Sequence, residues 1–123
     1  MQHLFVPYHI SFMAKEIGFN EPCLFFYNDN QELSGICEIK IEYRYYNHVC
    51  TKACAAPLYQ QLVDFFRINH KIEISVYYES IIGWWYSLNS MKNDAPLVPT
   101  DYRKDYYKSL NKALEEAFKL IKS

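Results

Sequence analysis

The sequence predicts an α+β domain with the element order αββαββα and one four-stranded, mainly antiparallel sheet that carries its helices chiefly on one face. Three patterns lead to this prediction. Apolar residues recur at three- and four-residue intervals before residue 70 and alternate with polar residues directly after it, as in a helix that feeds into a strand. Strict alternation also runs over residues 36–46. A long amphipathic pattern over residues 102–121 indicates a final helix.

Size and composition indicate one domain over residues 1–123. Half of the residues are hydrophobic and 18% are aromatic, which is enough for a packed core and too apolar for a disordered chain. The element order further indicates two similar ββα halves, about 22–70 and 71–123, which follow a short N-terminal helix.

The N-terminal helix is expected over Tyr8–Ile17, where Gly18 can supply the left-handed residue that ends a helix. An aromatic strand follows over Cys23–Asn28. Turn formers at residues 28–30 and 34–35 then lead to a second strand over Ile36–Tyr46, whose alternation leaves one of its faces polar.

The first half ends with a helix, for which Pro57 fits the first position and which extends to about Asn69. Asn69 or His70 can take the positive φ angle that stops it, and Lys71 begins the third strand. The fourth strand is expected over residues 81–88, and Gly83 within it marks a bulge or a close approach of another backbone. Thr100 or Asp101 is expected to cap the last helix.

The most informative surface is an aromatic face of the predicted sheet. The first and fourth strands are apolar on both faces, so both should be central and covered twice, but the N-terminal helix is too short to cover the second face fully. With Ile82, Trp84, Tyr86 and Leu88 on the core face, the predicted binding residues share the other side. They are Tyr46, Tyr77, Trp85 and Ile81, with Arg44 and Lys40 nearby.

Two readings of this face stay open. In one, Trp85 packs under the first helix as an ordinary core residue, and a bulge at Gly83 would exchange Trp84 and Trp85 between the faces. In the other, the face binds a partner, because Trp and Tyr are enriched where proteins dock. We therefore expect a non-enzymatic binding protein that self-associates as a homo-oligomer or captures a host protein.

Two alternative functions use other chemistry. A small-ligand sequestering protein would stack a nucleotide-like ring on Tyr46, Tyr77 and Trp85, with Arg44 and Lys40 on its phosphate. A Cys/His enzyme or zinc site would use His48, Cys50 and Cys54, completed by Cys37 or His70, although the spacing lacks the repeated two-residue gap of common zinc motifs.

Charge and motif content exclude several classes of function. The net charge of -1 and the pI near 6.4 do not suit non-specific nucleic-acid binding, and the three glycines form no phosphate-binding loop, so no cofactor is expected. The longest apolar run, residues 81–86, is far too short to span a bilayer, so no membrane partner is expected. The predicted location is the cytoplasm of a bacterial cell, with reduced cysteines.

Three segments resemble a group of small uncharacterised proteins encoded in gut bacterial prophages and mobile elements. They are APLYQQLVDFFRINHKIEI (56–74), GFNEPCLFFYNDN (18–30) and YYKSLNKALEEAFKLIK (106–122). The group has no known activity. The resemblance implies a phage or mobile-element origin, and accessory proteins of that kind often act by binding host components.

Overall fold

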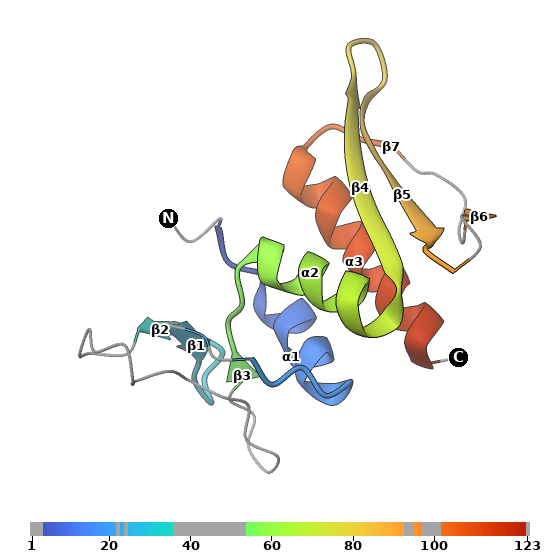
Figure 1. Cartoon of the computed structure of the whole chain (residues 1–123). Helices are drawn as coiled ribbons and strands as arrows, with labels where there is room; N and C mark the ends of the chain where they lie inside the picture. The colour runs from blue at the N-terminus through green and yellow to red at the C-terminus, as the bar shows by residue number, and fades with distance from the viewer. Residues whose placement is uncertain are drawn as a thin grey trace. The chain divides into compact units, whose positions relative to one another are not determined.

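The computed structural model describes residues 4–21, 23, 25–35, 54–92, 95–96 and 102–122, with only the backbone at residues 35, 95, 96, 102 and 122 (Figure 1). The predicted second strand over Ile36–Tyr46 therefore lies outside the described residues. The chain forms two compact units, residues 1–62 and 63–123, and the boundary falls within a helix. The predicted single domain with two ββα halves stays a prediction.

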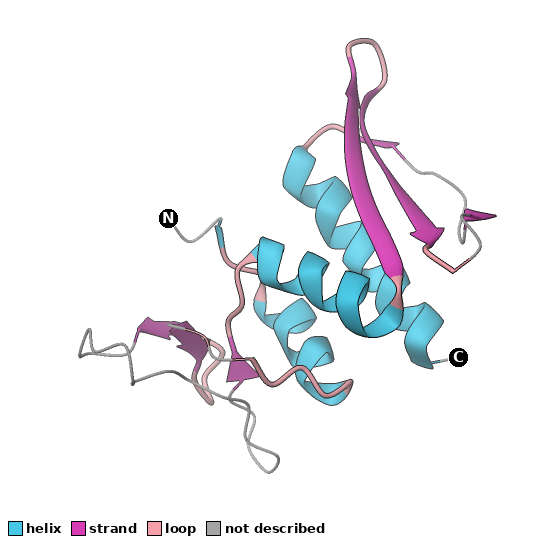
Figure 2. Ribbon diagram, in the orientation of Figure 1, coloured by secondary structure: helices cyan, strands magenta, loops and turns pink. Residues whose placement is uncertain are grey.

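The mixed α+β class is confirmed, but the single four-stranded sheet is wrong (Figure 2). One antiparallel sheet has the order β2-β1-β3, and a second consists of the hairpin β4–β5, to which β6 and β7 add on β5. There are two sheets because β1 pairs with β2 and β3, which both belong to the first unit, whereas β4 pairs with β5, the next strand of the second unit. Their bounds are β1 Phe25–Tyr27, β2 Leu33–Gly35, β3 Cys54–Ala55, β4 Ile72–Glu79, β5 Gly83–Ser90, β6 Ala95–Pro96 and β7 Tyr102–Arg103.

The first unit packs α1, Tyr8–Glu16, against β3. Gly18 has a φ of 92°, as expected for the residue that ends this helix. The buried Tyr27 hydroxyl donates a hydrogen bond of 2.7 Å to the Val6 carbonyl, and its ring meets Tyr8 edge to face at 5.6 Å. Tyr27, Cys54 and Ala56 form the centre of this core.

The turn between β1 and β2 explains why the second strand begins early. The Asn28 side chain accepts hydrogen bonds from the backbone N–H groups of Asn30 and Glu32, and Gln31 adopts a φ of 64°. These contacts close the turn before residue 33. Ser34 and Gly35, predicted to be turn residues, therefore belong to β2.

The second helix, α2 (Tyr59–His70), begins two residues after the predicted start at Pro57. Gln61 accepts a hydrogen bond of 2.9 Å from the Leu58 N–H, which satisfies a backbone donor at the start of the helix. The positive φ that follows the helix belongs to Lys71, at 56°, rather than to Asn69 or His70. The strand therefore starts at Ile72, one residue later than predicted.

The second unit is built on the hairpin β4–β5. Its register is regular from the pair Ile72–Ser90 to the pair Glu79–Gly83, so the alternative of a bulge at Gly83 is not realised. Gly83 begins β5 with a φ of 104°, and a Cβ atom there would lie 2.7 Å from the Arg103 carbonyl oxygen, which confirms the predicted close approach of another backbone. Residues 80–82 form the turn, so the fourth strand starts at residue 83 instead of 81.

The third helix, α3 (Tyr106–Lys122), packs against β4 and β5. It starts later than predicted because Tyr102 and Arg103 pair with β5 as β7. Asp105 caps it by accepting a hydrogen bond of 3.2 Å from the Lys108 N–H, and the predicted caps, Thr100 and Asp101, lie outside the described residues. Its buried stripe meets the hairpin face that carries Ile74 and Leu88; the stripe comprises Leu110, Ala113, Leu114, Ala117 and Phe118.

Candidate functional site

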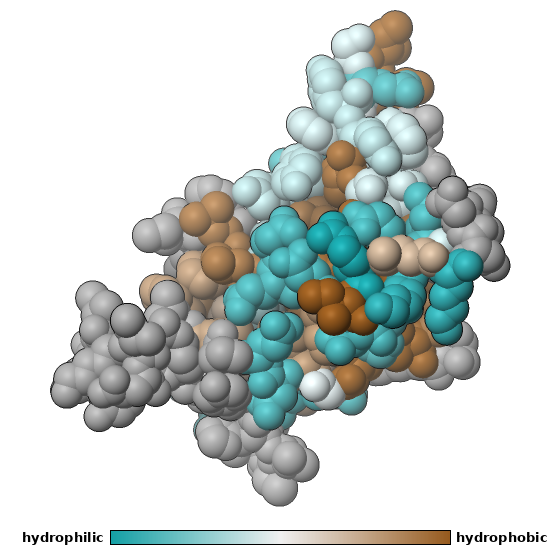
Figure 3. All heavy atoms as spheres, in the orientation of Figure 1, coloured by the Kyte–Doolittle hydropathy of each residue, from teal (hydrophilic) through white to brown (hydrophobic). Residues whose placement is uncertain are grey.

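The strongest candidate site is the outer end of the β4–β5 hairpin, which we call the hairpin end and define as Tyr77, Tyr78, Ile81, Ile82, Trp84 and Trp85. Four of these side chains are largely exposed: Ile81 at 95%, Tyr78 at 59%, Ile82 at 47% and Tyr77 at 44%. Figure 3 shows hydrophobic atoms gathered where the turn closes. Large apolar side chains exposed this close together are typical of an interaction surface.

Strand alternation sorts the aromatic residues onto the two faces of the hairpin. Tyr86 and Leu88 are buried, so Trp84 lies on the face that meets α3, and Trp85 lies on the opposite face. This is the predicted assignment of the two tryptophans. Ile82, which was also placed on the core face, instead lies in the turn and is half-exposed.

On the face away from α3, Tyr77 and Trp85 are direct cross-strand partners. Their rings stack with centroids 4.4 Å apart and an angle of 26° between their planes. Because the two rings stack on each other, a planar ligand cannot insert between them. It could stack only on a ring face that is turned away from the other ring. The predicted partners Tyr46, Arg44 and Lys40 lie outside the described residues.

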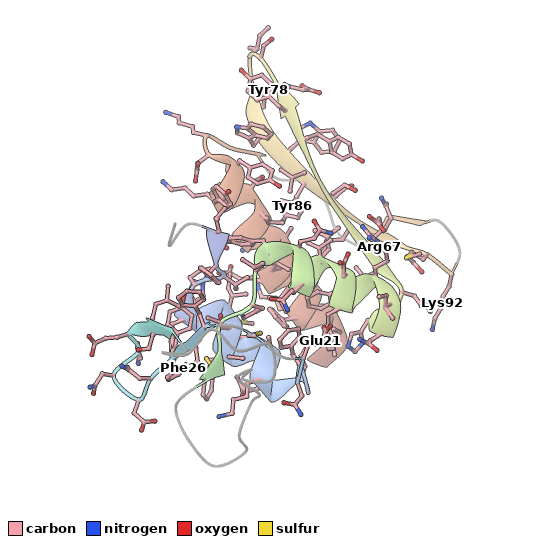
Figure 4. The ribbon with its side chains drawn as sticks, turned by 60° about the vertical axis from the view of Figure 1, so that its left-hand side comes forward. Glu21, Phe26, Arg67, Tyr78, Tyr86 and Lys92 are labelled. Carbon is pink, nitrogen blue, oxygen red and sulfur yellow. The ribbon has the colours of Figure 1, made fainter. Side chains whose placement is uncertain are left out.

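On the other face, a chain of ring contacts connects the hairpin to the start of α3. Tyr78 lies 5.0 Å from Trp84, and Trp84 meets Tyr106 edge to face at 5.1 Å. Figure 4 shows Tyr78 near the outer end of the hairpin and Tyr86 farther along it, toward the buried part. These contacts connect the exposed Tyr78 ring, through Trp84, to the start of α3.

An ion-pair cluster lies at the start of β4, away from the hairpin end. The Arg67 guanidinium donates two hydrogen bonds to Glu73, of 2.7 and 2.9 Å, and a third of 3.1 Å to Asp64. The hydrogen bonds from Arg67 lower the pKa of the Glu73 carboxyl below its ordinary value of 4.5. These ion pairs attach α2 to the start of β4.

The lowered pKa predicts a pH dependence of stability. Below its ordinary pKa, Glu73 binds a proton more readily in the unfolded chain than in the folded one, so its stabilising contribution is present above that value and is lost as the pH falls through the lowered folded pKa. We expect Glu73→Gln to reduce the free energy of unfolding at pH 7 and to match the wild type in strong acid.

Urea unfolding of both proteins across this pH range measures the difference. Glu79→Gln, which changes an exposed glutamate of the same strand, is the matched control and should show a smaller difference at neutral pH. A Glu73→Gln difference that stays constant from pH 7 into acid would contradict the lowered pKa.

The cysteine–histidine site finds no support in the described cysteines. Cys23 and Cys54 are buried free thiols, and burial raises their pKa values to about 12 and about 11. A thiol with so high a pKa is a poor nucleophile and a poor metal ligand at neutral pH. The described residues contain no cluster of metal-ligating side chains, and His48, Cys50 and Cys37 lie outside them.

We therefore predict that Cys23 and Cys54 resist alkylation in the folded protein. Iodoacetamide at pH 8 should leave both peptides unmodified, and the same reagent in urea should modify both, as followed by peptide mass spectrometry. Rapid labelling of Cys54 without urea would show an accessible thiolate and would reopen the catalytic alternative.

His70, the remaining candidate ligand, is the last residue of α2. Its ring packs against Phe65 at 5.3 Å and Phe66 at 5.9 Å, which gives it a packing role. A pocket of about 430 Å³ in the first unit is lined, among the described residues, by Tyr27, Gln31, Glu32 and Leu33, and the Tyr27 hydroxyl is engaged by the Val6 carbonyl. Neither feature supports a reaction.

Comparison of the chain with known protein families, with curated proteins and with solved structures found no match. None of the described helices combines the length and apolar character that a membrane span requires.

The sequence pattern pointed to Tyr77, Trp85 and Ile81 as members of this surface but not to Tyr78. Strand alternation had placed Tyr78 on the core side of the sheet. The length of the hairpin could have shown that Tyr78 is exposed. The start of β4 is buried at Ile72 and Ile74, and the strand continues beyond this buried part to Tyr78.

Proposed function

We propose that this chain is a non-enzymatic binding protein that associates through the hairpin end, either with a second copy of itself or with a protein of the host cell. The observation that carries the proposal is the exposure of Ile81 and Tyr78 beside half-buried tryptophans. Tyr and Trp side chains bury a large area at little entropic cost, and they dominate the energetics of many protein interfaces. A phage or mobile-element accessory role fits such a protein.

The charges near the hairpin end also favour a protein partner over a phosphate-bearing ligand. Glu79 directly precedes the turn, and Glu73 shares its face with Tyr77 and Trp85. The Glu79 carboxylate repels phosphate. Among the described residues of this face no basic side chain is left to bind phosphate, because Arg67 is engaged by Glu73 and Asp64.

The test compares complexes formed by the wild type, Ile81→Asp and Ile68→Asp, using native mass spectrometry of the purified protein and of the protein in bacterial extract. Ile68 is 65% exposed on α2 and is not part of the hairpin end, so it is the matched control. We expect Ile81→Asp to lose the complexes that the other two proteins form. Identical complexes in all three, or none in the wild type, would contradict the proposal.

A further inference from the structure

The outer edge of β4 has no partner among the described strands of the second unit. In the sheet order, β5 lies between β4 and the short strands β6 and β7, which pair with residues 89–90 and 84–85 on its other edge. Among the described residues, β4 pairs only with β5. A strand edge exposes a row of backbone donors and acceptors that another strand can satisfy.

This edge has few of the features by which proteins usually prevent such pairing. Over Ile72–Glu79 the strand has no proline, no lysine and no bulge, its two charged side chains are Glu73 and Glu79, and its pairing register with β5 is uninterrupted for eight residues. Its outer part, around Tyr77 and Tyr78, is also its most exposed part. The open backbone edge and the exposed rings therefore lie on the same part of β4.

We propose that two copies of this chain form a dimer by pairing the outer halves of their β4 strands antiparallel, with Tyr77 on the two-fold axis. The proposal rests on the proposed function, because it names the partner of the hairpin end. The result would be a continuous sheet in the strand order β5-β4-β4-β5. A second copy is a suitable partner because the same strand offers both a complementary edge and a matching set of side chains.

Charge selects the register. In a symmetric antiparallel pair, centring on Val76 places Glu73 of each copy opposite Glu79 of the other, which is repulsive. Centring on Ser75 extends the pairing over the start of the strand. The second copy would then have to pack against the ion pair between Arg67 and Glu73.

Centring on Tyr77 avoids both problems. It places Val76 opposite Tyr78 of the second copy and Ser75 opposite Glu79, so no two carboxylates face each other. The exposed Tyr77 and Tyr78 rings of both copies become covered. This register leaves the ion-pair cluster at the start of β4 outside the contact.

The experiment uses two substitutions of the axial residue in the full chain. Tyr77→Lys places two ammonium groups opposite each other on the axis, and we expect the dimer Kd to rise by at least about tenfold, with partial recovery in high salt. Tyr77→Thr removes the same ring without adding charge and keeps a strand-forming side chain, so it should weaken the dimer less. Circular dichroism verifies that both variants are folded.

Sedimentation equilibrium gives the Kd, and hydrogen exchange locates the interface. We expect those amides of residues 75–79 that point away from β5 to gain protection as the concentration rises, while those of β5 do not change. A dimer without this protection, or equal weakening by Tyr77→Lys and Tyr77→Thr, would overturn the strand pairing. A purified protein that is monomeric at all concentrations would overturn it as well, while complexes in bacterial extract that Ile81→Asp abolishes would leave the proposed function standing.

Discussion

Replacing Gly83 by alanine is expected to lower the free energy of unfolding by about 2–4 kcal/mol. Two effects add at this position. The φ of 104° is unfavourable for any residue with a Cβ atom, and that atom would lie 2.7 Å from the Arg103 carbonyl oxygen. Because this oxygen belongs to the backbone of β7, it cannot rotate away, so β5 and β7 must separate. Urea unfolding followed by tryptophan fluorescence and circular dichroism measures the loss.

Gly18→Ala is the matched control. Gly18 has a similar φ of 92°, but no atom lies within 4 Å of the position of a Cβ there. Only the backbone strain remains, so we expect a loss of about 1 kcal/mol. If Gly83→Ala cost no more than Gly18→Ala, the close approach of β7 to the start of β5 would be contradicted.

Truncating Phe66 or Phe118 to alanine is expected to cost about 3–5 kcal/mol in each case. Both side chains are fully buried, and their rings meet edge to face at 5.0 Å, where α2 contacts α3. Removing either ring leaves a cavity and also deprives the other ring of its neighbour. The double substitution should therefore cost less than the sum of the two single ones, by about 0.5–1.5 kcal/mol.

Ile68→Ala controls for the loss of an apolar side chain from the same helix. Because Ile68 is 65% exposed, its truncation should change stability by no more than about 0.5 kcal/mol. A loss for Phe66→Ala as small as that for Ile68→Ala would show that α2 does not pack on α3 through this ring.

The sequence was most predictive where one periodicity persists. Alternation over residues 72–79 identified β4 and correctly put Tyr77 beside Trp85, because cross-strand neighbours follow from a regular hairpin. The sheet arrangement could not be predicted in the same way. β3 is two residues long, and its pairing with β1 joins segments nearly thirty residues apart without any periodic pattern.

The predicted helix boundaries were wrong for reasons that differ from one helix end to the next. Tyr102 continues the apolar spacing of α3, yet it pairs with Trp85 in β7, because tertiary pairing outweighs a weak local preference. Asp101 and Asp105 are both good caps, and only the backbone path makes Asp105 the cap that accepts the Lys108 N–H. Lys71 was not expected at positive φ, since asparagine adopts it more readily than lysine.

The candidate site, like the fold, could be predicted from the sequence only where strand alternation decides it. Trp85 and Tyr77 could be placed on one face from alternation, but the exposure of Ile81 and Ile82 depends on where the turn lies. The turn is set by Gly83, whose positive φ and missing Cβ allow β7 to approach. Sequence alone gave Gly83 two readings, and only the backbone of Arg103 distinguishes them.

Tryptophan quenching tests whether the hairpin end is a binding surface, because both tryptophans of the chain, Trp84 and Trp85, belong to it. Acrylamide quenching is measured for the protein when dilute and free, and again when concentrated or in complex. We predict that association shields the indoles and lowers the quenching constant, and that Ile81→Asp removes this change while Ile68→Asp keeps it. Quenching that is the same in the free and associated states would contradict a binding surface at the hairpin end.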